Sequence, residues 1–264
     1  MSVTWKFGST DLTSIGAYSI ITFEDANTLP SRRGDNPVIP QREGRLYVPK
    51  FYDQRLLSLG MYIKGANRSD FESKIDLFKA LFGKGNQQIL QRTMADGSVR
   101  QVGAEVSKFD ISQKSDRYCK ATVDFLLSSP FFRSTSKTSL TTTIDASPKT
   151  FTLTNPGTAD DRTAVITLTG PLTNPKIINI FTNPVTGLQE LVWVGYTGII
   201  AALDTRTIDV GNLTCYSGAN NYLNLLSHSG DAYFLLLKAG ANTIRVESAS
   251  TGGTVKIEFY APYF

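Results

Sequence analysis

The stretch from Cys119 to Ser134 constrains the fold most, because it combines a clear strand pattern with an abrupt stop. Its apolar residues fall at every second position: Val123, Phe125 and Leu127. Alternation of this kind is typical of a β-strand with one buried face. Pro130 cannot donate a hydrogen bond to a sheet, so we expect the strand to end near Ser129.

A hydrophobic pair and a polar run follow this strand. Phe131 and Phe132 need burial, because two adjacent exposed Phe side chains would form an unusual apolar patch. Nine of the ten residues at 134–143 are Ser, Thr or Lys, which indicates a linker. The sequence therefore predicts two domains and a connection: a domain at residues 1–133, a linker at 134–147 and a second domain at 148–264.

The two halves of the chain differ in charge. Residues 1–133 hold 19 Lys+Arg and 14 Asp+Glu, a net charge of +5, whereas residues 134–264 hold 8 and 9, a net charge of −1. This difference supports a boundary near residue 133. The basic excess contains no run of Lys and Arg, so we do not expect sequence-specific nucleic-acid binding.

Composition limits the class of protein further. Apolar residues make up 41% of the 264 residues, which is enough for packed cores. No run of 18 apolar residues is present, so we expect no membrane insertion, and the N-terminus lacks the pattern of a secretion signal. Cys119 and Cys215 fall in different halves, and we expect buried free thiols rather than a disulfide.

The first half is predicted to be a β-rich domain with one amphipathic helix. Ser69 can cap the helix together with Glu72 three residues later, and Gly83 and Gly85 would end it. One face of the helix is apolar: Phe71, Ile75, Phe78 and Phe82, widened by Leu77 and Leu81. Strand candidates surround the helix, and Asp96-Gly97 is a hairpin signal between two of them: 3–7, 18–23, 45–64, 88–94, 99–109 and 119–129.

Residues 27–45 interrupt this pattern with three Pro, two Gly, four Arg and little that could be buried. Loops of about twenty residues without structure of their own are usually functional or disordered. Two interpretations stay open, an arm that reaches onto a neighbouring subunit and a plain surface loop. In the first, the candidate contact residues are charged: Arg32, Arg33, Asp35, Arg42 and Arg45.

From residue 148 onward the chain has the pattern of a β-protein. Turn groups such as Asn183-Pro184 and Gly252-Gly253 separate short apolar or alternating runs, and no helical period of useful length is present. Eight strands are expected: 150–153, 164–168, 176–181, 191–194, 207–210, 232–237, 243–246 and 254–260. This number and spacing favour a β-sandwich of two sheets.

Residue types that carry catalysis or bind metals are scarce. His228 is the one histidine, and no Cys or His lies at ligand spacing from it, so we expect no metal site and no cofactor. Its loop context and the absence of a nucleophile motif argue against a catalytic triad, and we do not expect an enzyme. Trp193 and Tyr222 could stack on a sugar; packing within the sandwich is the alternative.

The order and spacing of several motifs are familiar across nearly the whole chain. The chain resembles the distal tail protein family of siphophages. In the first half the resemblance lies in Val38–Arg45 leading into Leu56–Ile63, the single helix, and the strand that ends in Pro130-Phe131-Phe132. In the second half it lies in four segments: Asn155–Thr158, Ala164–Leu168, Asp204–Thr207 and Tyr233–Val246.

The resemblance implies a structural component of the virion tail tip, assembled in the host cytoplasm. Residues 1–133 would form a homohexameric ring that joins the tail tube protein to the tail hub or baseplate and leaves a channel for DNA. Residues 148–264 would be a galectin-like sandwich on the outside, and Phe131 and Phe132 would pack at the seam between the two. Further expected partners are the tape measure protein and receptor-binding proteins.

A carbohydrate-binding adhesion module is the alternative function. In this case the sandwich would recognise host cell-wall sugar through Trp193 or Tyr222. The resemblance provides no catalytic residues, which agrees with the scarcity of such residues in the sequence.

Overall fold

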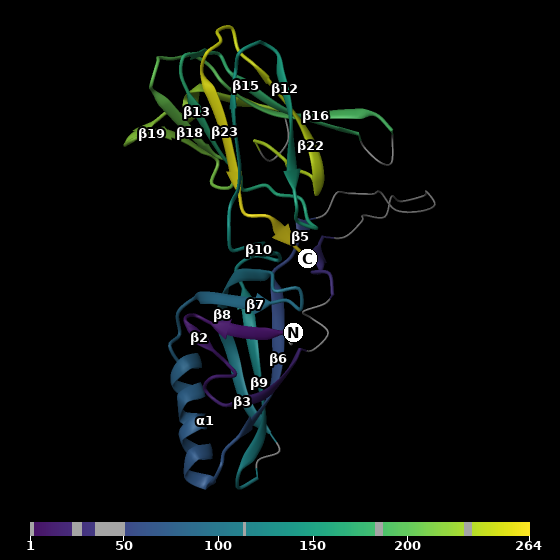
Figure 1. Ribbon diagram of the computed structural model, residues 1–264, viewed down its shortest axis with the longest axis vertical. Coiled ribbons are helices and arrows are strands. Elements are labelled where there is room, and N and C mark those ends of the chain that lie inside the picture. Colours follow the sequence, from purple (N-terminus) through teal and green to yellow (C-terminus); the bar gives the residue numbers. More distant parts are fainter. Residues whose placement is uncertain (1–2, 23–27, 35–50, 113–114, 183–186, 230–233) are drawn as a thin grey trace, which may run out of the picture. The chain divides into compact units, whose positions relative to one another are not determined.

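The computed structural model describes residues 3–22, 28–34, 51–112, 115–182, 187–229 and 234–264. The chain divides into two compact units, of which unit 1 is Met1–Arg133 together with Phe264 and unit 2 is Ser134–Tyr263. The fold is mainly β, as expected, and its described residues contain a single α-helix. Figure 1 shows both units and their labelled elements.

Unit 1 is built on one antiparallel sheet with the strand order β2-β1-β7-β8-β9-β6-β3. Two short strands, β4 (Arg32–Arg33) and β5 (Phe51–Tyr52), pair with each other outside this sheet, and β10 (Phe132–Ser134) pairs with β8. The main strands have the following bounds: β1 Thr4–Phe7, β2 Thr10–Asp11, β3 Ala17–Thr22, β6 Arg55–Lys64, β7 Gln88–Thr93, β8 Val99–Ser112 and β9 Tyr118–Leu127.

The alternation at Cys119–Ser134 forms the central strand that the sequence predicts. Along β9 the exposure of the side chains alternates, and one face is fully buried: Cys119, Ala121, Val123, Phe125 and Leu127. The strand ends at Leu127, before Pro130. The hairpin at Asp96-Gly97 is also confirmed, because Thr93 of β7 pairs with Val99 of β8 and Gly97 adopts φ +84°.

Helix α1 (Arg68–Phe82) packs its apolar face against this sheet, beside which it lies in Figure 1. Phe78 and Phe82 meet Phe109 of β8, and Phe82 also meets Phe125 of β9 and Phe7 of β1. The ring centroids are 5.1–6.4 Å apart in these contacts. The helix thus joins three strands through one aromatic core.

The helix begins two residues earlier and with a different cap than the sequence pattern suggests. Asn67 is the N-cap, and its side chain accepts a hydrogen bond of 2.9 Å from the Asp70 amide. The Asp70 carboxylate accepts one of 2.7 Å from the Ala66 amide. Ser69 therefore lies inside the helix, and Leu77, expected on the apolar face, is 52% exposed.

Unit 2 contains two sheets, with the orders β11-β23-β13-β18-β19-β20 and β12-β22-β15-β16-β21. The six-stranded sheet has these bounds: β11 Thr138–Thr143, β13 Val165–Thr169, β18 Thr205–Asp209, β19 Thr214–Ser217, β20 Asn220–Asn221 and β23 Thr254–Phe259. The five-stranded sheet has these: β12 Lys149–Asn155, β15 Lys176–Thr182, β16 Gln189–Tyr196, β21 Leu226–His228 and β22 Gly240–Glu247. Smaller strands complete the unit: β14 Leu172–Thr173, β17 Ile199–Ile200 and β24 Pro262–Tyr263.

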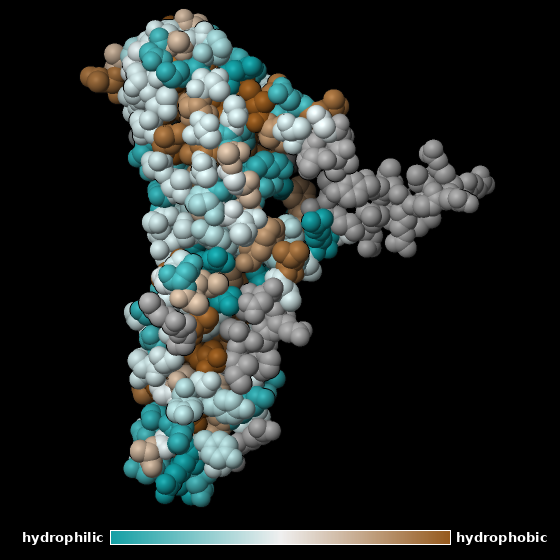
Figure 2. Space-filling view, turned by 45° about the vertical axis from the view of Figure 1, so that its right-hand side comes forward, coloured by the Kyte–Doolittle hydropathy of each residue, from teal (hydrophilic) through white to brown (hydrophobic). Residues whose placement is uncertain are grey.

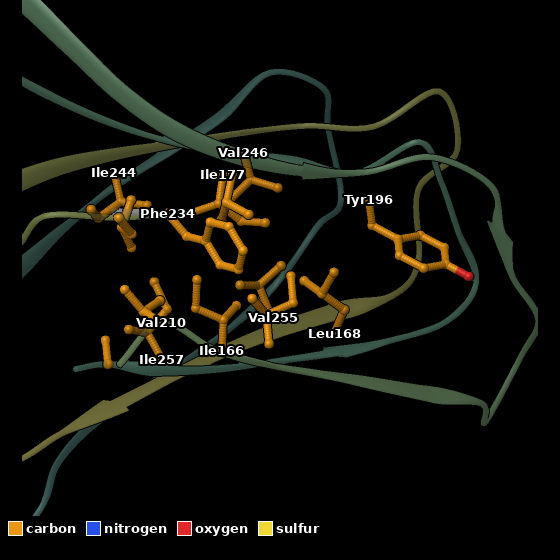
Figure 3. Packing of buried hydrophobic residues seen from close by; sticks show 14 of the residues in the cluster. Ile166, Leu168, Ile177, Tyr196, Val210, Phe234, Ile244, Val246, Val255 and Ile257 are labelled. Carbon is orange, nitrogen blue, oxygen red and sulfur yellow. The ribbon is translucent and has the colours of Figure 1, made fainter. Parts of the chain in front are cut away.

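Buried aliphatic side chains fill the space between the two sheets (Figure 3). Ile166 and Ile257 come from the six-stranded sheet, whereas Ile177 and Val246 come from the five-stranded one, and all four are inaccessible to solvent. The second unit is therefore the two-sheet β-sandwich that the sequence predicts.

Residues 134–147, expected to be a linker, are instead partly a strand of this sandwich. β11 pairs with β23 over six positions, from Thr138 opposite Phe259 to Thr143 opposite Thr254. Thr and Ser are good edge-strand residues because their side chains tolerate solvent on one face. The polar composition of this segment thus marks an edge strand.

The expected strand at 232–237 is wrong where the structure describes it. Phe234–Leu237 are buried, but apart from one isolated bridge between Leu237 and Asp161 they pair with no strand. Buried asparagine side chains bind the backbone of this segment instead. The Asn155 amide donates to Leu237 O at 3.5 Å and the Asn179 amide donates to Leu236 O at 2.6 Å.

Candidate interaction surfaces

The candidate arm at 27–45 contains one strand of a short two-stranded ribbon in unit 1. β4 and β5 pair with Arg32 opposite Tyr52 and Arg33 opposite Phe51. Each guanidinium group lies over the ring opposite it, at 5.2 Å and 5.9 Å from the ring centroids. Both arginines are exposed. The other three candidate contact residues lie outside the described residues: Asp35, Arg42 and Arg45.

Arg55 holds the backbone near the start of the candidate arm at 27–45. The sequence pattern did not identify it as a contact residue. Its side chain is only 5% exposed, and it donates to Thr28 O at 2.9 Å and to Pro130 O at 3.3 Å. The alternation along β6 could have identified Arg55 as a buried charge, because Arg55 shares its face with the buried Leu57 and Leu59. A charged residue on the apolar face of a strand needs buried acceptors.

The aromatic pair after Pro130 packs within unit 1. Phe132 is 3% exposed and meets Trp5 edge-on at 6.2 Å. Phe131 is half-buried and forms a three-ring cluster with Tyr52 and Phe264, with centroids 5.3–5.5 Å apart. The burial of Phe132 agrees with the expectation that this pair needs burial. The role of the pair at a domain seam stays a prediction.

The two candidate sugar-stacking residues of unit 2 lie apart in the fold, Trp193 within the five-stranded sheet and Tyr222 after the last strand of the six-stranded one. Trp193 is in β16 on the face opposite Val192 and Val194, and Lys176 Nζ lies 4.0 Å from its ring centroid. Tyr222 follows β20 and packs against the interior cluster. Each ring already has a cation over it, since the Arg206 guanidinium carbon is 4.2 Å from the Tyr222 centroid. The structure does not join the two rings into one stacking platform.

His228 is exposed at the end of β21, where Nδ1 lies 2.6 Å from the Ser229 carbonyl oxygen. Among the described residues no group of three or more His, Cys, Asp or Glu side chains is arranged to hold a metal ion. Cys119 and Cys215 are buried thiols that form no disulfide, as predicted.

None of the helices in the described part of the chain is both long and apolar enough to span a bilayer.

Apolar side chains reach the surface at several separate places in each unit on the face seen in Figure 2. The most exposed large apolar residues in the described part of the chain lie in turns and at edges: Tyr18 at 77%, Leu188 at 68%, Ile199 at 72% and Leu203 at 90%. Leu203 also has φ +69°, a left-handed backbone that a leucine rarely adopts.

Comparison with known proteins gives a clear likeness in structure and none in sequence. No protein-family model and no curated protein sequence matches the chain. The crystal structure of the SPP1 Dit protein, described as a paradigm of the hub adsorption apparatus in phages that infect Gram-positive bacteria, matches with a TM-score of 0.63. The match has 12% identity and covers 98% of this chain and 99% of that one.

The baseplate of phage P2 in its activated conformation with Ca matches with a TM-score of 0.39 and 9% identity over 98% of each chain. The SPP1 likeness shows that the two-unit fold of this chain is Dit-like, because it extends over both units.

Proposed function

We propose that this chain is a structural, non-enzymatic component of a phage tail tip. In this proposal it forms a homohexameric ring that joins the tail tube to the tail hub or baseplate and leaves a channel for DNA. It is assembled in the host cytoplasm and resides in the virion. The observation that supports the proposal is the Dit-like fold, which covers the whole chain rather than one unit.

Residues 1–133 would form the ring, and residues 148–264 would be a galectin-like outer domain. A closed ring requires a heterologous contact, in which two different surfaces of the subunit meet and the rotation closes. The exposed arginines of β4 are candidates for one of these surfaces, because both are held in place by stacking on β5. Tape measure and receptor-binding proteins would be further partners, and Phe131 and Phe132 would set how the outer domain projects.

The mass of the purified protein tests the ring directly. One chain has a mass of 28.9 kDa, so a hexamer has six times that mass, about 173 kDa. Native mass spectrometry and light scattering are expected to detect this species, and electron micrographs are expected to show a six-fold ring with a central opening. A strictly monomeric protein at high concentration, also after cross-linking, would refute the ring.

A charge reversal tests the part played by β4. The double substitution Arg32→Glu and Arg33→Glu is expected to shift the protein toward smaller species, because it places repulsive charge on the proposed contact. The matched control is Lys6→Glu with Lys84→Glu, two exposed lysines of the same unit whose exchange alters net charge equally. Loss of the hexamer in both variants would indicate a general effect of charge. It would contradict a specific role of β4 in the interface.

A further inference from the structure

A buried arginine closes one end of the sandwich in unit 2. Arg206 lies in β18 directly opposite Leu168 of β13 and shares its face with Ile208, both of which belong to the interior cluster. Its side chain points inward, and the residue is only 8% exposed. A guanidinium group stays protonated at any ordinary pH, so a full positive charge lies on the apolar side of this sheet.

Two tyrosines from outside β18 hold this guanidinium group in place. Arg206 Nε donates to Tyr196 Oη at 3.2 Å, and its guanidinium carbon lies 4.2 Å from the Tyr222 centroid. Tyr196 belongs to the other sheet, and Figure 3 shows its hydroxyl group pointing away from the aliphatic cluster. Arg206 Nη1 also donates to Thr205 O at 2.7 Å. The group therefore has a fixed orientation.

These contacts leave the guanidinium group without a close ion pair in the described part of the chain, although the nearby Asp204 carboxylate favours its charged form. No carboxylate among those residues comes within 4.0 Å of a nitrogen of Arg206. The two hydrogen bonds use two of the five N–H donors of the guanidinium group, and both acceptors are neutral. A largely buried guanidinium group with no close ion pair keeps N–H donors that a ligand or water can accept from.

The turn before β18 has an unusual backbone conformation close to this guanidinium group in the sequence. Leu203 holds φ +69° and is 90% exposed, three residues before Arg206. A non-glycine residue in this conformation is strained, and such residues cluster at ligand-binding sites. Neither burial nor packing of the Leu203 side chain within the chain offsets this strain.

We propose that Arg206 binds an oxyanion, a carboxylate or phosphate group carried by a ligand, at this end of the sandwich. The planar fork of a guanidinium group matches both anions through two parallel N–H···O bonds. The stacked Tyr222 and the hydrogen bond to Tyr196 preorganise the fork, so little side-chain entropy is lost on binding. The site is independent of the proposed ring, because all its residues belong to unit 2.

Anion-dependent stability of the full-length protein tests the site. Melting temperatures are measured against increasing sodium phosphate and, separately, sodium acetate, each matched in ionic strength with sodium chloride. A ligand that binds the folded state raises the melting temperature as its concentration exceeds Kd. We expect a saturating rise of the melting temperature in at least one of the two titrations. A rise with phosphate alone or with acetate alone tells which anion the site prefers.

Variants identify the residue responsible. Arg206→Met is expected to abolish the saturating rise of the melting temperature. Arg206→Lys keeps the charge but loses the planar fork, so it is expected to raise the half-saturating anion concentration about tenfold or more. Arg245→Met is the matched control, because Arg245 is ion-paired with Glu247 at 2.9 Å. General salt effects on stability act on all variants alike.

A measurement on the unmodified protein keeps the test valid if Arg206→Met does not fold. The Nε–H resonance of Arg206 in the ¹⁵N NMR spectrum is expected to shift on addition of phosphate or acetate, with the same midpoint as the melting curves. The proposal is overturned if neither anion moves this resonance, or if Arg206→Met folds and keeps the full rise. The guanidinium group would then be a purely structural closure of the sandwich.

Discussion

At the scale of single residues, burial decides the chemistry of Cys215. The thiol is inaccessible to solvent, and burial raises its pKa from the ordinary value of 9.0 to about 11, although the charge of Arg206 opposes this. Only the thiolate reacts quickly with disulfide reagents. In a Cys119→Ser variant we therefore expect no reaction of the native protein at pH 8 and one reactive thiol per chain in denaturant, followed by absorbance. Rapid labelling of the native protein would contradict the burial.

The same raised pKa gives a pH dependence of stability. Between pH 9 and about 11 the unfolded thiol has ionised while the folded one stays protonated, so the unfolded state binds fewer protons. The contribution of Cys215 to stability is complete below pH 9 and is lost as the pH rises toward 11. Cys215→Ala should flatten the fall in the free energy of unfolding over this range, measured by urea titration at several pH values.

Asn179 and Asn242 determine how the irregular segment at 234–239 is held. The Asn179 amide donates to Leu236 O at 2.6 Å and to Asn242 Oδ1 at 2.8 Å, and Asn242 Oδ1 also accepts from the Lys238 amide. Asn179→Ala leaves a buried carbonyl without its donor, so we expect a loss of about 1–3 kcal/mol in the free energy of unfolding of unit 2. Asn224→Ala, at an exposed position, should change it by less than about 0.5 kcal/mol.

At the scale of elements, the sequence before α1 allows two N-caps, Ser69 and Asn67, and the structure shows which of them forms. Ser69 with Glu72 fits the capping pattern, but Asn67 with Asp70 makes the hydrogen bonds. Asn67→Ala should lower the stability of unit 1 by about 1 kcal/mol, whereas Ser69→Ala, inside the helix, should have little effect or stabilise slightly. Circular dichroism during urea unfolding measures both variants. A larger loss of stability for Ser69→Ala than for Asn67→Ala would indicate that Ser69 is the N-cap.

Elements whose side chains alternate regularly could be predicted from the sequence, and β9 and α1 are the clearest cases. Phe234–Leu237 misled the prediction because a buried apolar run is compatible with a central strand, and nothing local reveals that its backbone binds asparagines distant in sequence. The edge strand β11 was missed for the opposite reason, since its polar composition resembles a linker.

The candidate contact residues were predictable only in part. The arginines of β4 stood out by composition, whereas Arg55 and Arg206 each occupy one apolar position of an otherwise ordinary strand. Sequence alternation could have placed both on buried faces. Their partners could not be predicted, because Thr28, Tyr196 and Tyr222 come from segments whose proximity only the fold establishes.

At the scale of the whole molecule, each unit has its own hydrophobic core. Phe78 and Phe125 lie in that of unit 1, whereas Ile166 and Ile257 lie in that of unit 2. Ile257→Ala should destabilise unit 2 by about 2–5 kcal/mol and leave unit 1 unchanged, because the residues clustered with Ile257 all belong to unit 2. We expect two calorimetric transitions, of which only one moves. A single transition that shifts as a whole would show that the two units unfold cooperatively.

The ribbon of β4 and β5 has a consequence for how such a chain can diversify. Arg33 and Phe51 are paired across it, so the ends of the intervening segment are already fixed side by side by contacts within unit 1. The closure entropy of a loop grows only with the logarithm of its length, about 0.6 kcal/mol for each doubling. Lengthening the chain between Arg33 and Phe51 therefore adds little closure entropy, and selection for a new neighbour can act on the length of this connection while its paired ends stay the same.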